Sequence, residues 1–275
     1  MASVNTNAGA MVALQNLNRT NQELQTVQNR INTGLSVASA KDIGGIYAIA
    51  QNMRAEVGSL RAVNNSLDLA ISVVDVSLAA GDAISDLLIE MKEKALAASD
   101  VSLDSASRTA LSEDFKALRD QISTIVENAE FNGSNLIDGS MSGGISALAN
   151  AKGTNTINVS DEDLSLSGTI LGLSGGTDIA SQSDASAAVT AIESALTNLN
   201  SALARLGTGS KSLEIHKTFV SKLSDSLEKG IGNLVDADLA KESARLQSLQ
   251  VKQQLGIQAL SIANSAPATV LGFFR

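Results

Sequence analysis

A heptad repeat that runs from Ile46 to Ala98 constrains the fold of this chain more than any other feature. With Ile46 at position a, apolar residues fill nearly every a and d position, and only Glu56, Ser77 and Gly81 interrupt them. The a positions are Ile46, Met53, Leu60, Leu67, Val74, Gly81, Leu88 and Ala95, and the d positions are Ile49, Glu56, Val63, Ala70, Ser77, Ile84, Met91 and Ala98. This spacing predicts one long coiled-coil helix, about 80 Å in length at 1.5 Å per residue. Such a helix needs partner helices along its seam.

Two later segments have the spacing of partner helices. After a predicted N-cap at Asp104 or Ser105, apolar residues alternate at steps of four and three, which predicts a helix that folds back on the first. These residues are Leu111, Phe115, Leu118, Ile122, Ile125 and Ala129. Heptads return after Asp184 and continue to Leu234. Gly207 and Gly209 lie within them and predict a kink or a loosened turn, because glycine weakens a helix by about 1 kcal/mol.

The segment between these helices has a different composition. Nine of the 21 glycines fall between Asn132 and Gly176. Asn132-Gly133 predicts a tight turn, and the runs Thr156 to Ser160 and Leu164 to Leu173 are β-like. Residues 132–182 are therefore the one predicted β-rich region.

Each end of the chain carries one more predicted helix. The first, from Ala8 to about Leu35, is weakly amphipathic because Asn and Gln dilute its apolar face, and a break follows at Ser36–Gly45. The second, from Asn233 to Asn264, has two apolar faces, and we expect it to end at Pro267. One face carries Leu239, Leu246, Leu249, Ile257 and Leu260, and the other carries Val251, Leu255 and Ile262.

These patterns predict a mainly α fold, an elongated antiparallel helical bundle or coiled coil built from both chain ends, with a small β-rich Gly/Ser/Thr middle segment. Residues 1–40 and 235–275 would form a terminal helical pair, residues 41–131 and 183–234 a rod, and residues 132–182 a variable region. One face of the last helix would pair with the first helix, and another copy of the chain would cover the other face. Periodicity does not say which face does which. The predicted packing residues are Leu17, Leu24, Ile31, Leu246, Leu249, Val251, Leu255, Ile257, Leu260 and Ile262.

Composition narrows the function. A formal charge of −9 with scattered basic residues argues against nucleic acid as a partner, and a core with only five Phe, one Tyr and no Trp argues against a deep ligand pocket. No cysteine is present, so disulfide and thiolate chemistry are absent. We expect no membrane insertion, because the longest apolar stretch, Leu67 to Ile89, carries four aspartates. The first residues also lack the charged and apolar regions of a secretory signal.

The residues that could carry chemistry favour structural interpretations. His216 is the one histidine and has no cysteine or second histidine to complete a zinc site or a triad. The acidic run 161–163 lacks the EF-hand pattern, and Gly209-Ser210-Lys211 lacks the rest of a phosphate loop. Asp236 and Asp238 suit the N-terminus of the last helix. We therefore expect no catalytic residues, no cofactor and no metal, and no enzyme activity.

Three separated motifs resemble one family. The first is Arg30-Ile31-Asn32-Thr33-Gly34-Leu35 followed by Ser39-Ala40-Lys41-Asp42 and Ala48-Ile49-Ala50. The second is Glu130-Phe131-Asn132-Gly133 with Leu136, and the third is Asn233-Leu234-Val235-Asp236-Ala237-Asp238-Leu239-Ala240-Lys241-Glu242. In order and spacing they resemble the bacterial flagellins, and most closely the short flagellins of alphaproteobacteria. The resemblance covers about residues 1 to 140 and 183 to 275.

The resemblance implies a structural subunit that self-polymerises into the extracellular flagellar filament and serves swimming motility. The terminal pair would form the inner filament core and 132–182 the outer surface, with Lys41 and Asp42 in the inter-domain linker. It also implies unfolded type III export without a cleaved signal peptide, and terminal helices that are disordered in the monomer and fold on assembly. The implied partners are a homopolymer, an export chaperone, the export apparatus, and junction and cap proteins.

The sequence departs from the family pattern at two places. Ile43 stands where a second Asp is common, followed by Gly44 and Gly45. The stretch used by the vertebrate flagellin receptor, L-Q-R-x-R-E-L, aligns with residues 88–94, where Ile89 and Glu90 replace Gln and Arg. A reversed charge there predicts weak receptor activation or none.

Two alternatives remain open. A flagellar filament-junction protein shares such terminal helices, although it usually has a longer middle and ends less like Leu-Gly-Phe-Phe-Arg. A non-flagellar coiled-coil interaction module could also show these heptads, but it would need a second functional element, and none is evident in the sequence.

Overall fold

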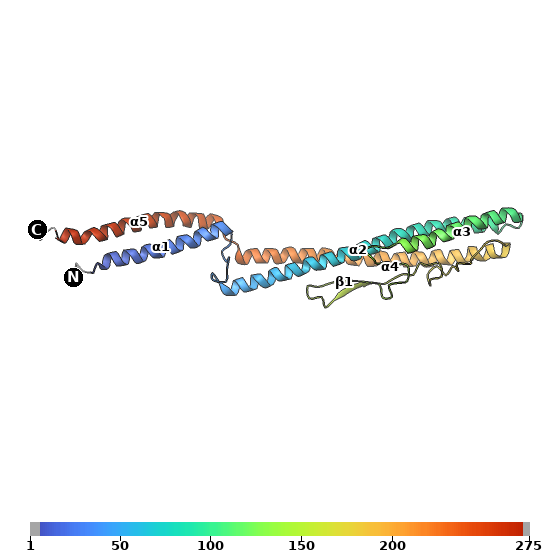
Figure 1. The fold of residues 1–275 in the computed structure, drawn as a ribbon, viewed down its shortest axis with the longest axis horizontal. Helices are drawn as coiled ribbons and strands as arrows, with labels where there is room; N and C mark the ends of the chain where they lie inside the picture. Colours follow the sequence, from blue (N-terminus) through green and yellow to red (C-terminus); the bar gives the residue numbers. More distant parts are fainter. Residues whose placement is uncertain (1–5, 272–275) are drawn as a thin grey trace. The chain divides into compact units, whose positions relative to one another are not determined.

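The computed structural model describes residues 6–271, with side chains described through Ser265. Within them, five helices and one two-stranded antiparallel sheet follow in the order α1, α2, α3, β1, β2, α4, α5, which confirms the mainly α fold (Figure 1). The bounds are Ala8–Thr33 (α1), Gly44–Ala98 (α2), Ser105–Asn128 (α3), Ile145–Leu148 (β1), Thr156–Val159 (β2), Gln182–Val235 (α4) and Leu239–Leu271 (α5). The terminal Gly272–Arg275 motif lies outside these residues.

The chain divides into two compact units, and α2 and α4 each contribute to both. One unit comprises the chain up to Ala55 and from Asp225 onward, and the other comprises Glu56–Ser224. The helix breaks, by contrast, lie at residues 34–43 and 236–238, near the boundaries expected from sequence. The three-part division predicted from sequence therefore stays a prediction.

The long heptad segment is one continuous helix, α2, of 55 residues. From Leu60 onward its a and d positions are buried, as predicted. In its first turns the buried frame differs, because Ala50 and Val57 are buried while Ile49 is 53% exposed. A local shift of this kind is a stammer in the heptad, and it explains why Glu56 can stand at a nominal d position.

The other two interruptions have local explanations in the packing. Ser77 is fully buried, and its hydroxyl donates to the backbone oxygen of Val73, so no polar group is left without a partner. At Gly81, an added Cβ would overlap the side chain of Leu203 on α4. The missing side chain therefore lets α4 approach α2 closely at this point.

Helix α3 begins where the capping residue predicts. The Asp104 carboxylate accepts a hydrogen bond from the backbone N–H of Ser107 at 2.6 Å. Arg108 then ties the turn to α2, because its guanidinium donates to the backbone oxygens of Ala98 and Asp100 at 2.8 and 2.9 Å. Phe115 and Ile122 of α3 are completely buried.

The middle segment contains less β-structure than the sequence suggested. β1 pairs with β2 from Ile145 opposite Val159 to Leu148 opposite Thr156, so the run that begins at Thr156 is confirmed as a strand. The run Leu164 to Leu173 is not a strand, and this prediction was wrong. Its backbone turns at Gly168 and Gly172, with bonds back to Ser165 and Gly168, and its leucines are buried without a partner strand.

The Asn132-Gly133 turn is confirmed. Both residues have positive φ, 51° and 79°, as a type I′ turn requires. The flanking residues Phe131 and Ser134 exchange backbone hydrogen bonds of 3.0 and 3.1 Å.

The predicted interruption of the second heptad segment is also wrong. Helix α4 runs unbroken through Gly207 and Gly209. A Cβ at Gly209 would come within 2.8 Å of Val159, so this glycine allows β2 to lie directly against the helix. His216 holds the other end of the hairpin, since its Nε2 lies 2.7 Å from the Ala149 oxygen.

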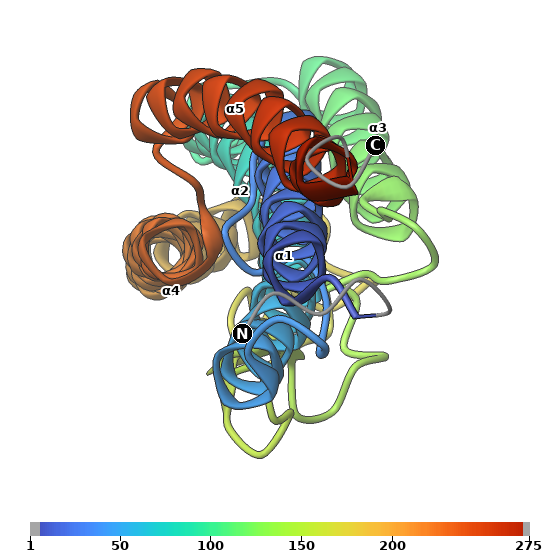
Figure 2. The same cartoon turned by 90° about the vertical axis from the view of Figure 1, so that its left-hand side faces the viewer.

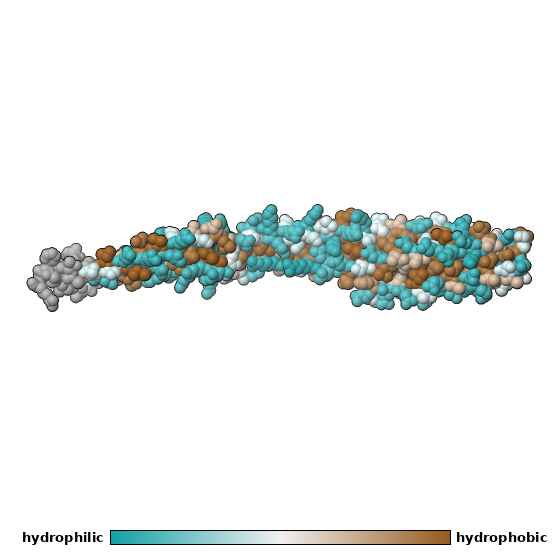
Figure 3. All heavy atoms as spheres, turned by 90° about the horizontal axis from the view of Figure 1, so that it is seen from above, coloured by the Kyte–Doolittle hydropathy of each residue, from teal (hydrophilic) through white to brown (hydrophobic). Residues whose placement is uncertain are grey.

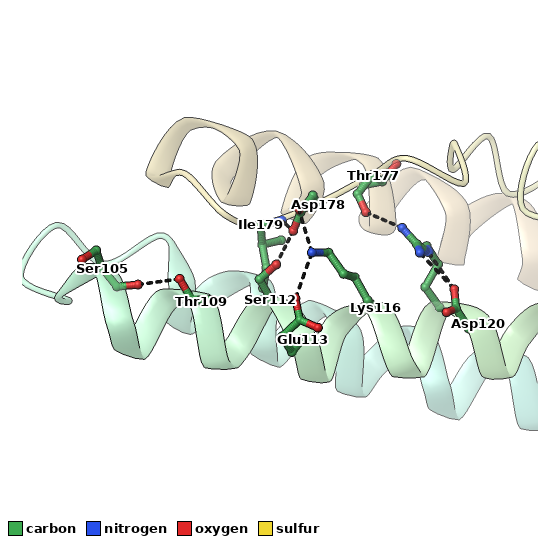
Figure 4. A network of polar contacts seen from close by, with 10 residues as sticks. Ser105, Thr109, Ser112, Glu113, Lys116, Asp120, Thr177, Asp178 and Ile179 are labelled. Carbon is green, nitrogen blue, oxygen red and sulfur yellow. Dashed lines mark hydrogen bonds and ion pairs between the residues drawn. The ribbon is translucent and has the colours of Figure 1, made fainter.

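A polar network fixes the segment before α4 to α3 (Figure 4). Asp178 accepts hydrogen bonds from the Ser112 hydroxyl and the Ile179 N–H, and Lys116 lies 3.3 Å from its carboxylate. Arg119 donates to the Thr177 oxygen at 3.2 Å. Although partial burial raises the pKa of Asp178, its hydrogen bonds from Ser112, Ile179 and Lys116 lower it more, and the net pKa is below the ordinary value.

Candidate assembly interface

Helices α1 and α5 lie side by side within one unit, as both views show (Figures 1 and 2). Over the described side chains their apolar core is small: Leu24, Val27 and Leu249 are buried, and Ile31 and Leu246 pack against them. Further toward the chain ends, Leu17 lies over Gly256, where a Cβ would come within 3.2 Å of it. The least exposed positions of α5 follow a heptad, 242-246-249-253-256-260-263.

Polar side chains occupy several positions of this seam. Gln253 donates to the Asn21 side-chain oxygen at 2.8 Å. Arg30 and Glu242 form an ion pair of 3.1 Å, with side chains 29% and 11% exposed. Because a paired polar group at a seam position fits one alignment of two helices, these contacts fix the register of α1 against α5.

Asn7 links the start of α1 to the far part of α5. Its side-chain oxygen accepts a hydrogen bond from the Ala10 N–H at 3.0 Å and caps α1. Its side-chain nitrogen donates to the Ala263 oxygen at 2.6 Å. In a regular helix that oxygen would bond to the N–H of residue 267, but Pro267 has none.

The expectation that Pro267 ends the last helix is therefore wrong, since α5 continues to Leu271. The carbonyl that proline leaves unbonded has a partner in Asn7. A donor from the opposite end of the chain thus makes proline tolerable inside this helix.

The two helix breaks lie against each other. Gly34 ends α1 in the left-handed conformation, with φ of 72°, and its oxygen accepts the Ala237 N–H at 2.9 Å. In return, the Val235 oxygen at the end of α4 accepts the N–H of Ser36 at 2.7 Å. Leu35 and Asp236 form an isolated antiparallel bridge there.

The predicted linker residues lie just beyond this junction. Asp42 closes the turn, because its carboxylate accepts the backbone N–H and hydroxyl of Ser39 at 2.9 and 3.1 Å and the N–H of Ala38 at 3.1 Å. These bonds, with the Ser39 N–H the strongest, hold the pKa of Asp42 below its ordinary value. Lys41 is exposed. Asp238 caps α5 by accepting the N–H groups of Ala240 and Lys241, both at 3.1 Å.

The face of α5 that points away from α1 is apolar and exposed. Val251, Leu255 and Ile262 are 55%, 57% and 71% exposed. Ile257 is also 54% exposed, although sequence reasoning grouped it with Leu246. Figure 3 shows apolar side chains at the surface of the α1 and α5 pair. On α1 itself, Met11, Val12 and Leu14 are exposed and were not among the predicted packing residues.

The structure thus places the predicted packing residues in two groups. Leu17, Leu24, Ile31, Leu246, Leu249 and Leu260 lie along the α1–α5 seam, and Val251, Leu255, Ile257 and Ile262 are exposed. Glu242, Gln253 and Gly256 complete the seam but were missed, and Val27, an apolar position of the first helix, was not among the predicted packing residues. Extending steps of three and four from Leu249 would have reached Gln253 and Gly256.

Two other kinds of site are absent from the described part of the chain. Among the described residues, no group of three or more His, Cys, Asp or Glu side chains could hold a metal ion. Over the same residues, no helix combines the length and apolar character needed to cross a membrane.

Comparison with known proteins identifies the family. Residues 4–142 match the family model for the bacterial flagellin N-terminal helical region, and residues 189–274 match that for the C-terminal helical region. The chain is 55% identical over 273 residues to flagellin FljK of Caulobacter vibrioides, covering 99% of this chain and 98% of that protein. It is 36% identical to a flagellin of Brucella melitensis, with both chains covered completely.

One solved structure supports the fold. A putative flagellar hook-associated protein from Vibrio parahaemolyticus matches with a TM-score of 0.59 over 71% of this chain and all of that one, at 16% identity. The sequence matches are far stronger and span both terminal regions and the middle between them. On this evidence the chain belongs to the bacterial flagellins, the structural subunits of the flagellar filament.

Proposed function

We propose that this flagellin polymerises through the outer face of α5, and that the terminal helical pair becomes stably folded only when neighbouring subunits cover that face. The observation that carries the proposal is the exposed stripe of Val251, Leu255 and Ile262 opposite the α1 seam. Burying a Leu, Val or Ile side chain contributes roughly 1.5 to 3 kcal/mol. A helix with this stripe therefore gains several kcal/mol from a partner on its second side.

The small core of the pair supports coupled folding and assembly. Among the residues up to Ser265, whose side chains the structure describes, Leu24, Val27 and Leu249 alone form the buried cluster between these helices of 26 and 33 residues. Ordering each residue costs about 1 to 2 kcal/mol in backbone entropy, so a seam this small stabilises an isolated pair weakly. Contacts with neighbours would supply the remaining free energy.

Location and partners follow from the same proposal. The assembled chain would lie outside the cell in the filament, after unfolded export by the flagellar type III system without a cleaved signal. An export chaperone, the export apparatus, and junction and cap proteins would be its further partners. Peptide mass spectrometry of native filaments tests the absence of a cleaved signal: an N-terminal peptide that begins at Met1 or Ala2 is expected, and one that begins within the α1 segment would contradict it.

Paired substitutions test the polymerisation surface. Val251→Asp and Leu255→Asp should raise the critical concentration of seeded filament growth more than ten-fold, because each replaces about 1.4 kcal/mol or more of apolar burial with a buried charge. Val101→Asp is the matched control, because Val101 is 83% exposed in the turn between α2 and α3. Sedimentation and electron microscopy would measure polymer. Normal growth of Val251→Asp and Leu255→Asp would overturn the proposal.

A further inference from the structure

A second unpartnered surface lies on α4, in the unit formed by Glu56–Ser224. Thr208, Lys211, Ile215 and Lys222 are exposed, and they recur at steps of three, four and seven on one side of the helix. We call these four residues the α4 stripe. Ile215 is 62% exposed, and it lines a shallow groove of about 530 Å³. The groove is lined by Ala204, Gly207, Thr208, Lys211, Ser212 and Ile215.

A matching surface lies on α2 in the same unit. Asp82, Ile89, Glu93 and Leu96 are exposed and recur at steps of seven, four and three, the reverse of the α4 stripe. We call them the α2 stripe. Its apolar members are large and exposed, with Ile89 at 47% and Leu96 at 60%. In the described part of the chain, no side chain pairs with Asp82, Glu93 or Lys222.

The two stripes are complementary when the helices run antiparallel. Opposed in order, Leu96 meets Thr208, Glu93 meets Lys211, Ile89 meets Ile215, and Asp82 meets Lys222. Both opposed charge pairs are of opposite sign, and Ile meets Ile between them. Leu96 then stands over the hollow beside Gly207. Lys211 lies 3.2 Å from Glu214, but its side chain is 69% exposed and free to turn to a partner.

We propose that the α4 stripe of one subunit docks on the α2 stripe of a second copy of this chain. The inference rests on the proposed function, because it assumes that the chain polymerises, and it names a second contact and its register. Two copies that point the same way bring α4 of one antiparallel to α2 of the other, since α2 and α4 are antiparallel within a subunit. The different stripes on the two subunits make the contact heterologous and open-ended.

The same pairing cannot form within one chain. Inside a subunit Lys217 lies 2.5 Å from Asp68, and Lys92 lies 2.9 Å from Glu193. These pairs set an alignment in which Ile215 stands near Ala70 rather than Ile89. In the proposed contact, α4 faces a part of the neighbouring α2 that lies about nineteen residues further along than the part it faces within its own subunit. At 1.5 Å per residue this corresponds to an axial stagger between subunits of about 28 Å.

Cysteine pairs test the register directly, because the chain has no cysteine of its own. Disulfides require Cα atoms about 4.4–6.8 Å apart. Filaments of Ile89→Cys/Ile215→Cys and of Leu96→Cys/Thr208→Cys should therefore give a ladder of covalent multimers after oxidation. Ile89→Cys/Thr208→Cys uses the same two faces seven residues out of register, about 10 Å away, and should give none.

Charge reversal supplies an independent readout. Two double variants reverse the charges of one stripe each: Lys211→Glu/Lys222→Glu and Asp82→Lys/Glu93→Lys. Each should slow filament growth at low salt at least ten-fold. The variant that combines all four substitutions should restore the growth rate. Lys152→Glu/Glu127→Lys reverses exposed charges off the stripes and is the control. If unsubstituted protein forms no filaments, the proposed function fails. If filaments form but neither in-register cysteine pair gives covalent multimers, the proposed contact is wrong. It is also wrong if the fourfold variant does not regain normal filament growth.

Discussion

Asn7 offers a test of how the two ends of the chain depend on each other. Asn7→Asp keeps an acceptor for the Ala10 N–H, and a carboxylate suits a helix N-terminus, so the cap itself is preserved. The substitution removes the donor that lies 2.6 Å from the Ala263 oxygen. Because Pro267 provides no N–H, that oxygen loses its partner, which costs about 1 to 2 kcal/mol for a partly buried group.

The background substitution Pro267→Ala makes the test specific. It would restore the backbone N–H that a regular helix provides at this position, so the Ala263 oxygen would no longer need Asn7. In that background the effect of Asn7→Asp should fall to near zero. The coupling free energy between the two substitutions would then be about 1 kcal/mol, which corresponds to roughly five-fold in critical concentration.

The assay is the critical concentration of filament growth, measured by sedimentation for the four proteins of the cycle. Asn18→Asp, an exposed position on α1, controls for the added charge. An equal penalty for Asn7→Asp with and without Pro267 would show that Asn7 does not serve the Ala263 carbonyl, because its side chain would then act only as a cap.

Three further predictions concern other parts of the chain. Asp178→Asn should lower Tm at pH 7, because a carboxyl whose folded pKa is depressed stabilises the fold above its unfolded pKa of 3.8. This contribution declines below pH 3.8 and is lost as pH falls through the lower folded pKa, so the difference in Tm should shrink over that range; a pH-independent difference in Tm would contradict this. Arg205→Ala should destabilise by about 1 to 3 kcal/mol, since it leaves the Glu162 carboxylate, 7% exposed, without its two 2.6 Å bonds, and unchanged denaturant unfolding would count against it. Purified monomer should activate the vertebrate flagellin receptor weakly or not at all, because exposed Glu90 replaces a recognition Arg; a reporter-cell response at nanomolar dose would show this to be wrong.

Much of the helical architecture could be predicted because it depends on local spacing. The a and d positions of α2 from Leu60 onward, the Asp104 cap and the Asn132-Gly133 turn all follow from residues within a few positions of each other. Such patterns predict both the type of secondary-structure element and the face of it that is buried.

The wrong predictions share a different cause: the local structure depends on contacts with a segment far away in the sequence. Gly209 is a residue type that often breaks a helix, but here it allows Val159 to lie close to α4. Pro267 is tolerated inside α5 because Asn7, at the other end of the chain, bonds to the Ala263 carbonyl. The Leu164 to Leu173 run has strand-like leucines but no strand to pair with. None of these partners is visible in the local pattern.

The assembly surface was predictable only in part. Two apolar faces on the last helix are evident from periodicity, but the seam also contains Glu242, Gln253 and Gly256, whose partners lie on α1. Hydrophobicity alone therefore grouped Ile257 with the seam, whereas the geometry exposes it.

We propose above all that the α1 and α5 pair becomes stable only on assembly. Amide hydrogen exchange, followed in dilute monomer and in filaments, tests it most directly. We predict fast exchange over residues 8–33 and 239–265 in the monomer and strong protection of both in the filament, while the buried parts of α2, α3 and α4 in the unit Glu56–Ser224 are protected in both states. Equal protection of α1 and α5 in monomer and filament would show that the pair folds without assembly.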